Sequence, residues 1–162
     1  MKTFVADFET TVYDNQTYTE VWASAVVELN TEDVKVFHSI QETWDYFKSL
    51  KANLICYYHN LKFDGNFWLS YLMNDLKFEQ ATYTTGATVF DIEFYRSSQM
   101  KNNTFSYCIS DMGQWYRIII KINKHIIELR DSLKLLPFTV KRIGESFATK
   151  HKKLEMEYRV KL

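Results

Sequence analysis

The sequence predicts one mixed α/β domain, of the α+β kind, in which helices flank a mixed β-sheet. Three observations predict it: apolar strands come first, strands and helices then alternate, and a β-rich stretch follows from residue 82 to 131. The 46% hydrophobic and 25% charged residues are typical of a globular protein, although 17% aromatic residues is high. Because the chain has only 4 Gly, 1 Pro and no evident repeat, residues 1–162 are expected to form a single domain.

The first three strands are expected at residues 2–6, 21–29 and 34–38. The first is short and apolar and runs directly into acidic residues. The second is almost continuously apolar, which predicts a strand buried on both faces.

Two helices are expected to alternate with the next strand. Ser39 and Glu42 have the spacing of a capping box, and apolar residues then recur at helical intervals up to Leu50. Residues 53–58 form the next predicted strand. The second helix is expected after residues 60–65, because Phe67, Trp68, Tyr71 and Leu72 have the spacing of a helix that packs on a sheet.

The β-rich stretch is expected to form antiparallel strands at residues 88–95, 104–109, 114–122 and 125–129. Asn123-Lys124 stands where a two-residue hairpin turn would join the last two strands. Pro137 suits the first turn of a final helix, whose buried face would carry Val140, Ile143 and Phe147.

The net charge is zero, with 20 Lys+Arg against 20 Asp+Glu, so no overall basic field points to nucleic acid. The charge is nevertheless uneven. Residues 134–162 hold eight Lys or Arg against three acids, a surplus of +5 that the rest of the chain balances. A basic tail of this kind is either a solvated surface or a patch that contacts phosphates.

The cysteines and the N-terminus bear on the compartment. Cys56 and Cys108 lie far apart in expected buried strands, with neither zinc-site spacing nor the density of a secreted disulfide protein. Asp7 follows the start too closely for a signal peptide, and no run of about 18 apolar residues is present. We expect a soluble cytoplasmic protein that does not contact a membrane.

Asp7 and Glu9 are the first candidate functional residues. Side chains two apart in a strand face the same way, so both carboxylates would project together at the end of the first strand. Their repulsion favours a cation between them, and Mg²⁺ or Mn²⁺ prefers such hard oxygen ligands. Taken alone, an Asp-x-Glu pair is a weak signal and favours two exposed structural acids over a metal site.

Asp64 is the second candidate, because it lies at a strand-to-helix junction. It follows a predicted strand and precedes Gly65, which lets the carboxylate point toward the same end of the sheet as the first pair. Two acidic elements at one sheet edge favour a metal site over two unrelated surface acids.

Four blocks of sequence carry a family resemblance. They are Asp7-Phe8-Glu9-Thr10, His59-Asn60-Leu61-Lys62-Phe63-Asp64-Gly65, Met112-Gly113-Gln114-Trp115-Tyr116 and Asp131-Ser132-Leu133-Lys134-Leu135-Leu136-Pro137-Phe138. In this order they resemble the N-terminal 3′-to-5′ exonuclease domain of the protein-primed family B DNA polymerases of phages. The resemblance implies an RNase H-like, DnaQ-like fold.

The resemblance also implies a site. Asp7 and Glu9 match the first exonuclease motif of the family and Asp64 the second, so these three residues would be catalytic and would hold two Mg²⁺ or Mn²⁺ ions. Single-stranded DNA would contact five further positions, namely Thr10, Asn60, Phe63, Ser132 and Leu133. Each of the five also has a structural interpretation, as a strand-end hydrogen bonder, a turn residue or a core side chain.

His59 is interpreted as a partly buried, hydrogen-bonded histidine and not as a metal ligand. The family pattern also needs a third motif, Tyr-x-x-x-Asp on a later helix, and residues 155–162 are expected to be the strand before that helix. Two pairs have the same spacing but fall in other predicted elements, so we interpret them as coincidences. They are Tyr71 with Asp75 and Tyr107 with Asp111.

Three functions stay open. The first is a metal-dependent 3′-to-5′ exonuclease acting on single-stranded DNA, which would use a substitute acid such as Glu155 or Glu157, or be completed by another chain. The second is a catalytically weak module that binds nucleic acid or a protein, such as a replication protein or a host nuclease or defence complex. The third is a remnant that folds but does nothing alone.

Two further expectations follow from the missing elements. Without a polymerase domain, polymerisation by this chain is excluded. The surface that the third-motif helix would cover is expected to be apolar and to favour homo-oligomers. A phage-encoded protein of this kind would act in the cytoplasm of the host cell.

Overall fold

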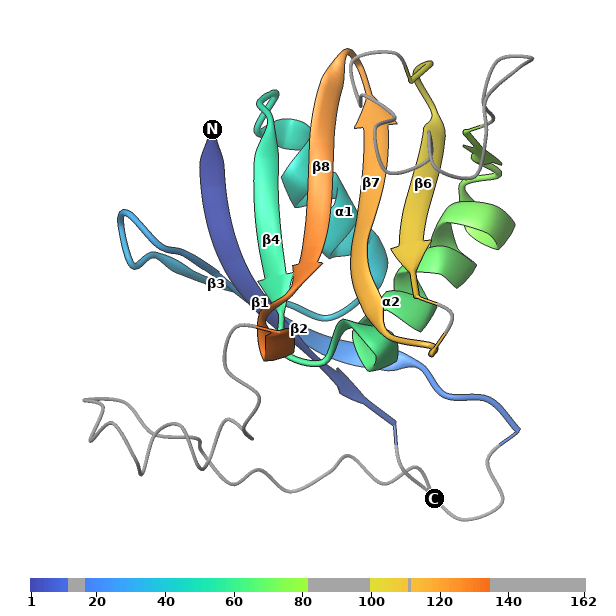
Figure 1. The fold of residues 1–162 in the computed structure, drawn as a ribbon. Coiled ribbons are helices and arrows are strands. Elements are labelled where there is room, and N and C mark those ends of the chain that lie inside the picture. Colours follow the sequence, from blue (N-terminus) through green and yellow to red (C-terminus); the bar gives the residue numbers. More distant parts are fainter. Residues whose placement is uncertain (12–16, 82–99, 111, 135–162) are drawn as a thin grey trace.

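A computed structural model describes residues 1–11, 17–81, 100–110 and 112–134, and their main element is an eight-stranded mixed sheet (Figure 1). The strand order is β3-β2-β1-β4-β8-β7-β6-β5. The strands are β1 (Lys2–Thr10), β2 (Val21–Glu28), β3 (Val34–Phe37), β4 (Leu54–Tyr58), β5 (Glu79–Gln80), β6 (Thr104–Ile109), β7 (Trp115–Ile122) and β8 (His125–Asp131). The mixed α/β class that the sequence predicts is confirmed.

The centre of the sheet is parallel, which positions the candidate site. β4 pairs in parallel with both β1 and β8, whereas the β1–β2, β2–β3, β7–β8 and β6–β7 pairs are antiparallel. The carboxyl ends of β1, β4 and β8 therefore meet at one edge of the sheet. In open sheets that contain parallel strands, ligands bind outside this edge.

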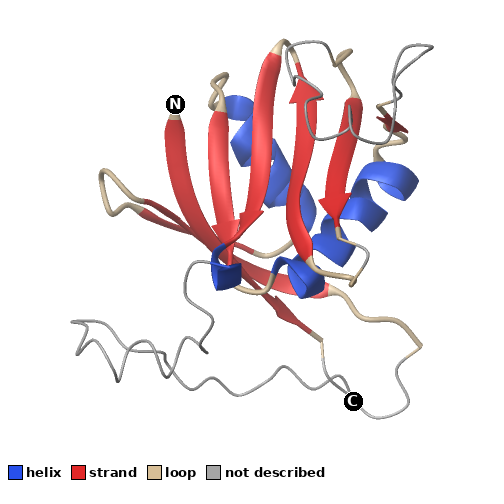
Figure 2. Cartoon of the chain, viewed as in Figure 1, coloured by secondary structure: helices blue, strands red, loops and turns tan. Residues whose placement is uncertain are grey.

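Two α-helices, α1 (Ile40–Ser49) and α2 (Leu61–Ser70), cover one face of the sheet (Figure 2). Ser39 caps α1 as expected, since its side chain accepts a hydrogen bond from the Glu42 backbone N–H at 3.1 Å. Trp44 of α1 and Trp68 of α2 pack on the same cluster, which also contains Phe4 of β1. The aromatic-rich layer between this face of the sheet and the two helices is the hydrophobic core of the described chain.

The other face of the sheet explains why one expectation for β2 is wrong. We expected residues 21–29 to be buried on both faces, but Val26 is buried while its neighbour Ala25 is exposed. Val34 and Val36 of β3 are each 61% exposed. Both described α-helices lie on the Val26 side, so within the described residues no helix covers the opposite face, which we call the open face.

Several local predictions are confirmed. Asn123 and Lys124 join β7 and β8 with φ angles of 48° and 67°, as a tight hairpin with two left-handed residues requires. Cys56 is buried in β4 and Cys108 is half-buried in β6. The expected strand 88–95 and the helix beginning at Pro137 lie outside the described residues.

Two short helical turns complete the described elements. The five-residue π-helix Tyr71–Asp75 continues α2, and the 3₁₀ turn Ser132–Lys134 follows β8. Tyr71 and Asp75 thus belong to the far end of α2, away from the carboxyl edge of the sheet, in agreement with a coincidental spacing. No helix in the described ranges is long and apolar enough to cross a membrane.

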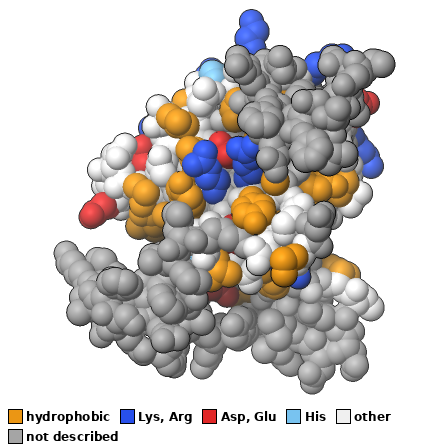
Figure 3. All heavy atoms as spheres, viewed as in Figure 1, with side chains coloured by type: hydrophobic (Ala, Val, Ile, Leu, Met, Phe, Trp, Pro, Cys, Tyr) orange, Lys and Arg blue, Asp and Glu red, His pale blue; other side chains and the backbone are white. Residues whose placement is uncertain are grey.

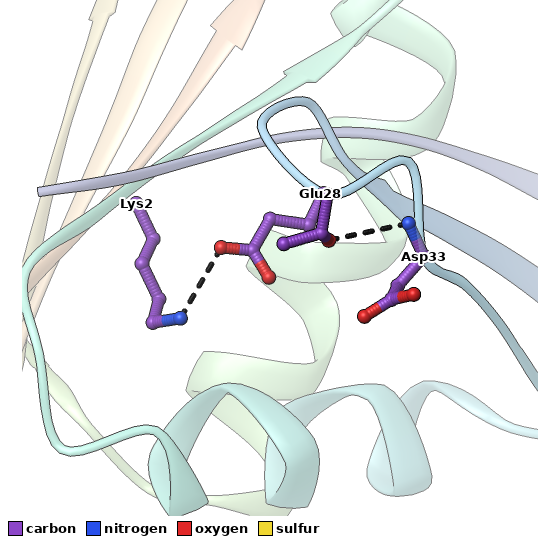
Figure 4. Close-up of polar contacts among 4 residues, drawn as sticks. Lys2, Glu28 and Asp33 are labelled. Carbon is purple, nitrogen blue, oxygen red and sulfur yellow. Dashed lines mark hydrogen bonds and ion pairs between the residues drawn. The ribbon is translucent and has the colours of Figure 1, made fainter.

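An ion pair joins β1 to β2 at the end of the sheet opposite the candidate site. Lys2 Nζ lies 3.2 Å from Glu28 Oε1, and Figure 4 shows the lysine reaching across to the glutamate. Phe4 of β1 is the backbone partner of Glu28, so the pair lies close to that position in the register. The pair belongs to strand pairing and not to the site.

Candidate functional site

A pocket of about 210 Å³ lies at the carboxyl edge of the parallel strands. Residues from the end of β1, the β4–α2 junction and the first turn of α2 line it: Asp7, Phe8, Glu9, Thr10, His59, Asn60, Phe63 and Asp64. The structure thus brings together six of the eight residues that the sequence singled out. In Figure 1 this edge is where β4 ends and α2 begins.

Asp64 is the most constrained acid of the pocket. Its side chain is only 2% exposed, and Oδ1 is buried with no hydrogen-bond partner among the described residues. Burial, followed by the charge of the Asp7 carboxylate, raises the pKa of Asp64 to about 8, although a hydrogen bond from the Phe8 backbone N–H acts in the opposite direction. A buried carboxylate oxygen without a donor partner is energetically costly, and a bound cation would remove that cost.

Asp7 and Glu9 lie in the last residues of β1, two positions apart, so their side chains project from the same face of the strand, as the two-residue periodicity predicts. Asp7 is exposed and Glu9 half-buried, and the charges of both raise the pKa of Asp64. The β1–β2 register shifts between Glu9 and Thr10, so the strand leaves regular pairing at the pocket. Thr10 is buried beside them, and the Trp22 indole N–H donates to its carbonyl oxygen at 3.1 Å.

Asn60 and Phe63 form the opposite wall of the pocket. Asn60 has a left-handed backbone (φ 73°), which asparagine tolerates better than most residues, and this conformation turns the chain from β4 into α2. Phe63 is 49% exposed and packs in a T-shaped arrangement on Phe67, with 5.6 Å between the ring centroids. The structure therefore excludes a core role for Phe63 and presents its ring at the pocket.

Ser132 and Leu133 do not line the pocket but lie next to it at the end of β8. Ser132 Oγ is 3.1 Å from His59 Nδ1, so His59 is hydrogen-bonded and half-buried, as expected. Leu133 is half-buried, and its backbone N–H donates to the side chain of Asp131 at 2.8 Å. Both residues thus act on the pocket through their neighbours.

Asp131 is the residue that the sequence analysis did not assign to the site. It is 7% exposed, and its Oδ1 accepts hydrogen bonds from the backbone N–H groups of Asn60 (3.1 Å) and Leu133 (2.8 Å). Its charge also raises the pKa of Asp64. The signal was present, because Asp131 opens the fourth block, but the expected strand ended at residue 129 and left this carboxylate outside the sheet edge.

Gly65 allows a close approach between α2 and β7 that the sequence did not show. It is a buried helical residue of α2, and a Cβ atom there would lie 3.0 Å from Trp115 Cζ3 and 3.3 Å from Ile118 Cδ1. Without a side chain, α2 packs directly on β7. This close packing seats the helix, and therefore Asp64, against the sheet edge.

The carboxylate oxygens of the pocket are the type of ligand that a divalent cation prefers, but among the described residues their positions do not form a complete metal site. Hard carboxylate oxygens, mutual repulsion and the buried Asp64 Oδ1 all favour Mg²⁺ or Mn²⁺. However, within the described ranges no three His, Cys, Asp or Glu side chains are placed to hold one metal ion together. The carboxylates share a pocket without converging on one point.

Comparisons with known proteins agree with this architecture. The family model of DNA polymerase type B, organellar and viral, matches residues 46–161. The DNA polymerases of Bacillus phages Nf and B103 are 35% and 34% identical over 164 residues, covering 97% of this chain and 25% of each relative. The solved structure of phi29 DNA polymerase complexed with single-stranded DNA has 29% identity and a TM-score of 0.74, covering 97% of this chain and 25% of that one.

The mixed sheet with three parallel strands ending at a carboxylate pocket defines an RNase H-like domain. The chain belongs to the family of type B DNA polymerases of organelles and viruses. It spans about a quarter of the length of the phage polymerases that it matches. The resemblance found in the four sequence blocks is thereby confirmed.

Proposed function

We propose that the chain is a metal-dependent 3′-to-5′ exonuclease domain acting on single-stranded DNA. One observation carries the proposal: Asp64 Oδ1 is buried without a hydrogen-bond partner among the described residues, in a pocket that also holds Asp7 and Glu9. A solved relative, phi29 DNA polymerase, is complexed with single-stranded DNA, which supports this class of substrate.

The acids of the pocket supply the metal ligands in this proposal. Asp7, Glu9 and Asp64 would hold Mg²⁺ or Mn²⁺, which when bound activates water and stabilises charge on the leaving oxygen of a phosphodiester. The chain itself contributes fixed carboxylate charge at the end of the parallel strands. Asp64 is carried by α2, which packs closely on β7 at the neighbouring residue Gly65.

The remaining residues of the pocket would orient the DNA terminus. Phe63 offers a half-exposed ring on which an unpaired base can stack. Asn60 and Thr10 line the same pocket and carry side chains that hydrogen-bond sugar or base atoms. Ser132 and Leu133 would contribute through the hydrogen bonds that they make to His59 and Asp131.

The test is digestion of a single-stranded oligonucleotide labelled at its 5′ end, with Mg²⁺ or Mn²⁺. A 3′-to-5′ exonuclease shortens the labelled strand stepwise. We expect Asp7→Asn and Asp64→Asn to lose this activity, while Asp75→Asn on the exposed far end of α2 keeps it. Equal digestion by the wild type and both pocket variants would show that the activity does not come from this site.

A second candidate function is single-stranded DNA binding without cleavage. It is favoured by the finding that no three potential ligands converge on one point within the described ranges. In that case Phe63→Ala would weaken DNA binding, whereas no metal would support digestion. The oligonucleotide assay separates the two candidates when DNA binding is measured beside it.

A further inference from the structure

Two arginines face each other on the open face of the sheet. Arg117 of β7 and Arg130 of β8 are direct cross-strand partners, and Tyr57 of β4 is the partner of Arg130 on its other side. We call Tyr57, Arg130 and Arg117 the arginine stripe. In the space-filling view, Lys and Arg side chains gather near the middle of this face (Figure 3).

The register of the sheet places the stripe directly beside the candidate pocket. Tyr57 lies two residues before His59, and Arg130 lies two residues before Ser132, and both His59 and Ser132 directly follow their strands at the carboxyl edge of the sheet. Two residues along a strand and one strand across correspond to about 8 Å between the backbones of Arg130 and His59. A chain leaving the pocket over the open face would reach the stripe next.

The stripe is held together by one shared acid. Glu128 Oε1 lies 2.9 Å from Arg130 Nε and 3.6 Å from Arg117 Nη1, and the Tyr57 hydroxyl also bonds to Arg130. Like charges on opposing strands repel, and Glu128 offsets this repulsion for both arginines. Two guanidinium groups on one carboxylate leave a local charge of +1.

The arginines remain accessible despite this contact. Each side chain is 39% exposed, whereas Glu128 is only 14% exposed. A guanidinium carries five N–H donors in a planar fork, more than the bonds to Glu128 and Tyr57 occupy. The stripe therefore presents oriented, cationic donors to solvent, the geometry that suits phosphate oxygens.

The pocket itself needs such a neighbour. Asp7, Glu9 and Asp131 place negative charge around Asp64 at the sheet edge, which repels a polyanionic strand. A bound metal offsets this only at the scissile phosphate. Arg117 and Arg130 are the two arginines of the described ranges, and strand alternation places them on the same face of the sheet as Asp7.

We propose that the arginine stripe binds the sugar–phosphate backbone of the single-stranded DNA whose 3′ end enters the pocket. The inference rests on the proposed function, because it places the strand upstream of that end. The contact is independent of base sequence, since guanidinium groups recognise phosphate oxygens. Tyr57 adds an aromatic ring beside the track.

The experiment is the salt dependence of DNA binding, measured by anisotropy of a fluorescent (dT)20 probe in Mg²⁺. The 3′-terminal linkages of the probe are phosphorothioates, which slow digestion during the measurement. Each lost phosphate contact lowers the slope of log K against log[salt] by about 0.7 for a single strand. Arg117→Gln/Arg130→Gln is therefore expected to lower the slope by about 1.4 and to weaken binding most at low salt.

Three comparisons make the result specific. Lys48→Gln on α1 removes one positive charge from a residue on the helix-covered side and should leave the slope unchanged. Arg117→Lys/Arg130→Lys keeps both charges and should retain most of the slope. Thermal melting of each variant shows whether the sheet is intact.

The outcomes separate the two proposals. Wild-type protein that does not bind the probe contradicts the proposed function itself. Wild-type binding that the folded Gln double variant matches in slope and affinity overturns the stripe alone, and would leave an acidic protein segment as the alternative occupant of this face. A loss of slope in the Gln variant but not in the Lys variant supports phosphate binding.

Discussion

Asp64 is the residue at which stability and function oppose each other. Its carboxyl group is buried beside other acids, so the fold favours the protonated form and raises its pKa to about 8. In the unfolded chain an aspartate has a pKa of about 3.9. The folded protein therefore binds one more proton than the unfolded chain between these values, and its stability falls as the pH rises from about 4 to about 8.

Asp64→Asn should consequently stabilise the metal-free protein. The amide cannot ionise, so the variant avoids the burial of a charge. At pH 8 its free energy of unfolding should exceed that of the wild type by on the order of 3 kcal/mol, and its melting temperature should be higher. The difference should shrink toward pH 5. Melting curves in EDTA over this range measure it, and a wild type that is as stable as the variant at pH 8 would contradict the buried charge.

Phe63 should matter for DNA and little for stability. Its ring is 49% exposed, so Phe63→Ala removes little core packing. Loss of one stacked base costs roughly 1–3 kcal/mol, or about 5- to 150-fold in Kd for an oligonucleotide. Anisotropy titration and thermal melting of the same sample check both parts. A large fall in melting temperature with unchanged Kd would assign Phe63 to the core instead.

Gly65 should be intolerant of any side chain. An added Cβ would meet the Trp115 ring at 3.0 Å, closer than normal packing, and Trp115 is itself nearly buried. Gly65→Ala gains helix propensity but forces α2 away from β7, and we expect a net loss of roughly 1–3 kcal/mol in the free energy of unfolding. Urea denaturation measures it. Increased stability would mean that Trp115 yields easily.

At the level of elements, the site depends on how β4 and β8 are joined at their carboxyl ends. Asp131 ties the Asn60 backbone to the turn after β8, and Ser132 contacts His59. These links hold the left-handed turn that leads into α2. The junction is thus positioned by hydrogen bonds that originate on a neighbouring strand.

Asp131→Ala should therefore loosen the pocket, whereas Asp131→Asn should restore most of the lost function, because its amide oxygen still accepts from the backbone N–H groups. We expect the Ala variant to raise the KM for single-stranded DNA more than it lowers kcat. Steady-state digestion of the oligonucleotide measures both constants. If the Asn variant were as impaired as the Ala variant, the charge of Asp131 would matter and not its hydrogen bonds.

The sequence predicted the elements of the site better than its details. Strand periodicity placed Asp7 and Glu9 together, and the strand-to-helix junction placed Asp64 at the same edge, because parallel strands end on one side of a sheet. The role of Gly65 and the inclusion of Asp131 depend on which strands become neighbours. That pairing is a tertiary property, which single-sequence patterns do not contain.

The arginine stripe shows the same limit. Arg117 and Arg130 are separated by a hairpin, and only the register of β7 against β8 makes them direct partners. Likewise, the prediction that both faces of β2 are buried requires helices on both faces of the sheet. In the described chain both α-helices pack on one face, so an apolar strand next to the edge of the sheet stays half exposed.

At the scale of the whole molecule, the chain is a domain of the type B DNA polymerase family whose carboxylate pocket lies beside the sheet face that carries Arg117 and Arg130. The fold and family follow from the architecture and the comparisons. Cation binding at Asp7, Glu9 and Asp64 is the central claim, because the proposed exonuclease activity depends on it.

Calorimetric titration of Mn²⁺ into the purified chain tests that claim most directly, with Asp64→Asn, Asp7→Asn and Asp75→Asn titrated in parallel. We predict binding to the wild type and to Asp75→Asn, with release of protons at pH 7 because Asp64 must ionise, and loss of binding in the two pocket variants. Mn²⁺ binding that all four proteins share, or that none shows, would contradict a metal site at this sheet edge.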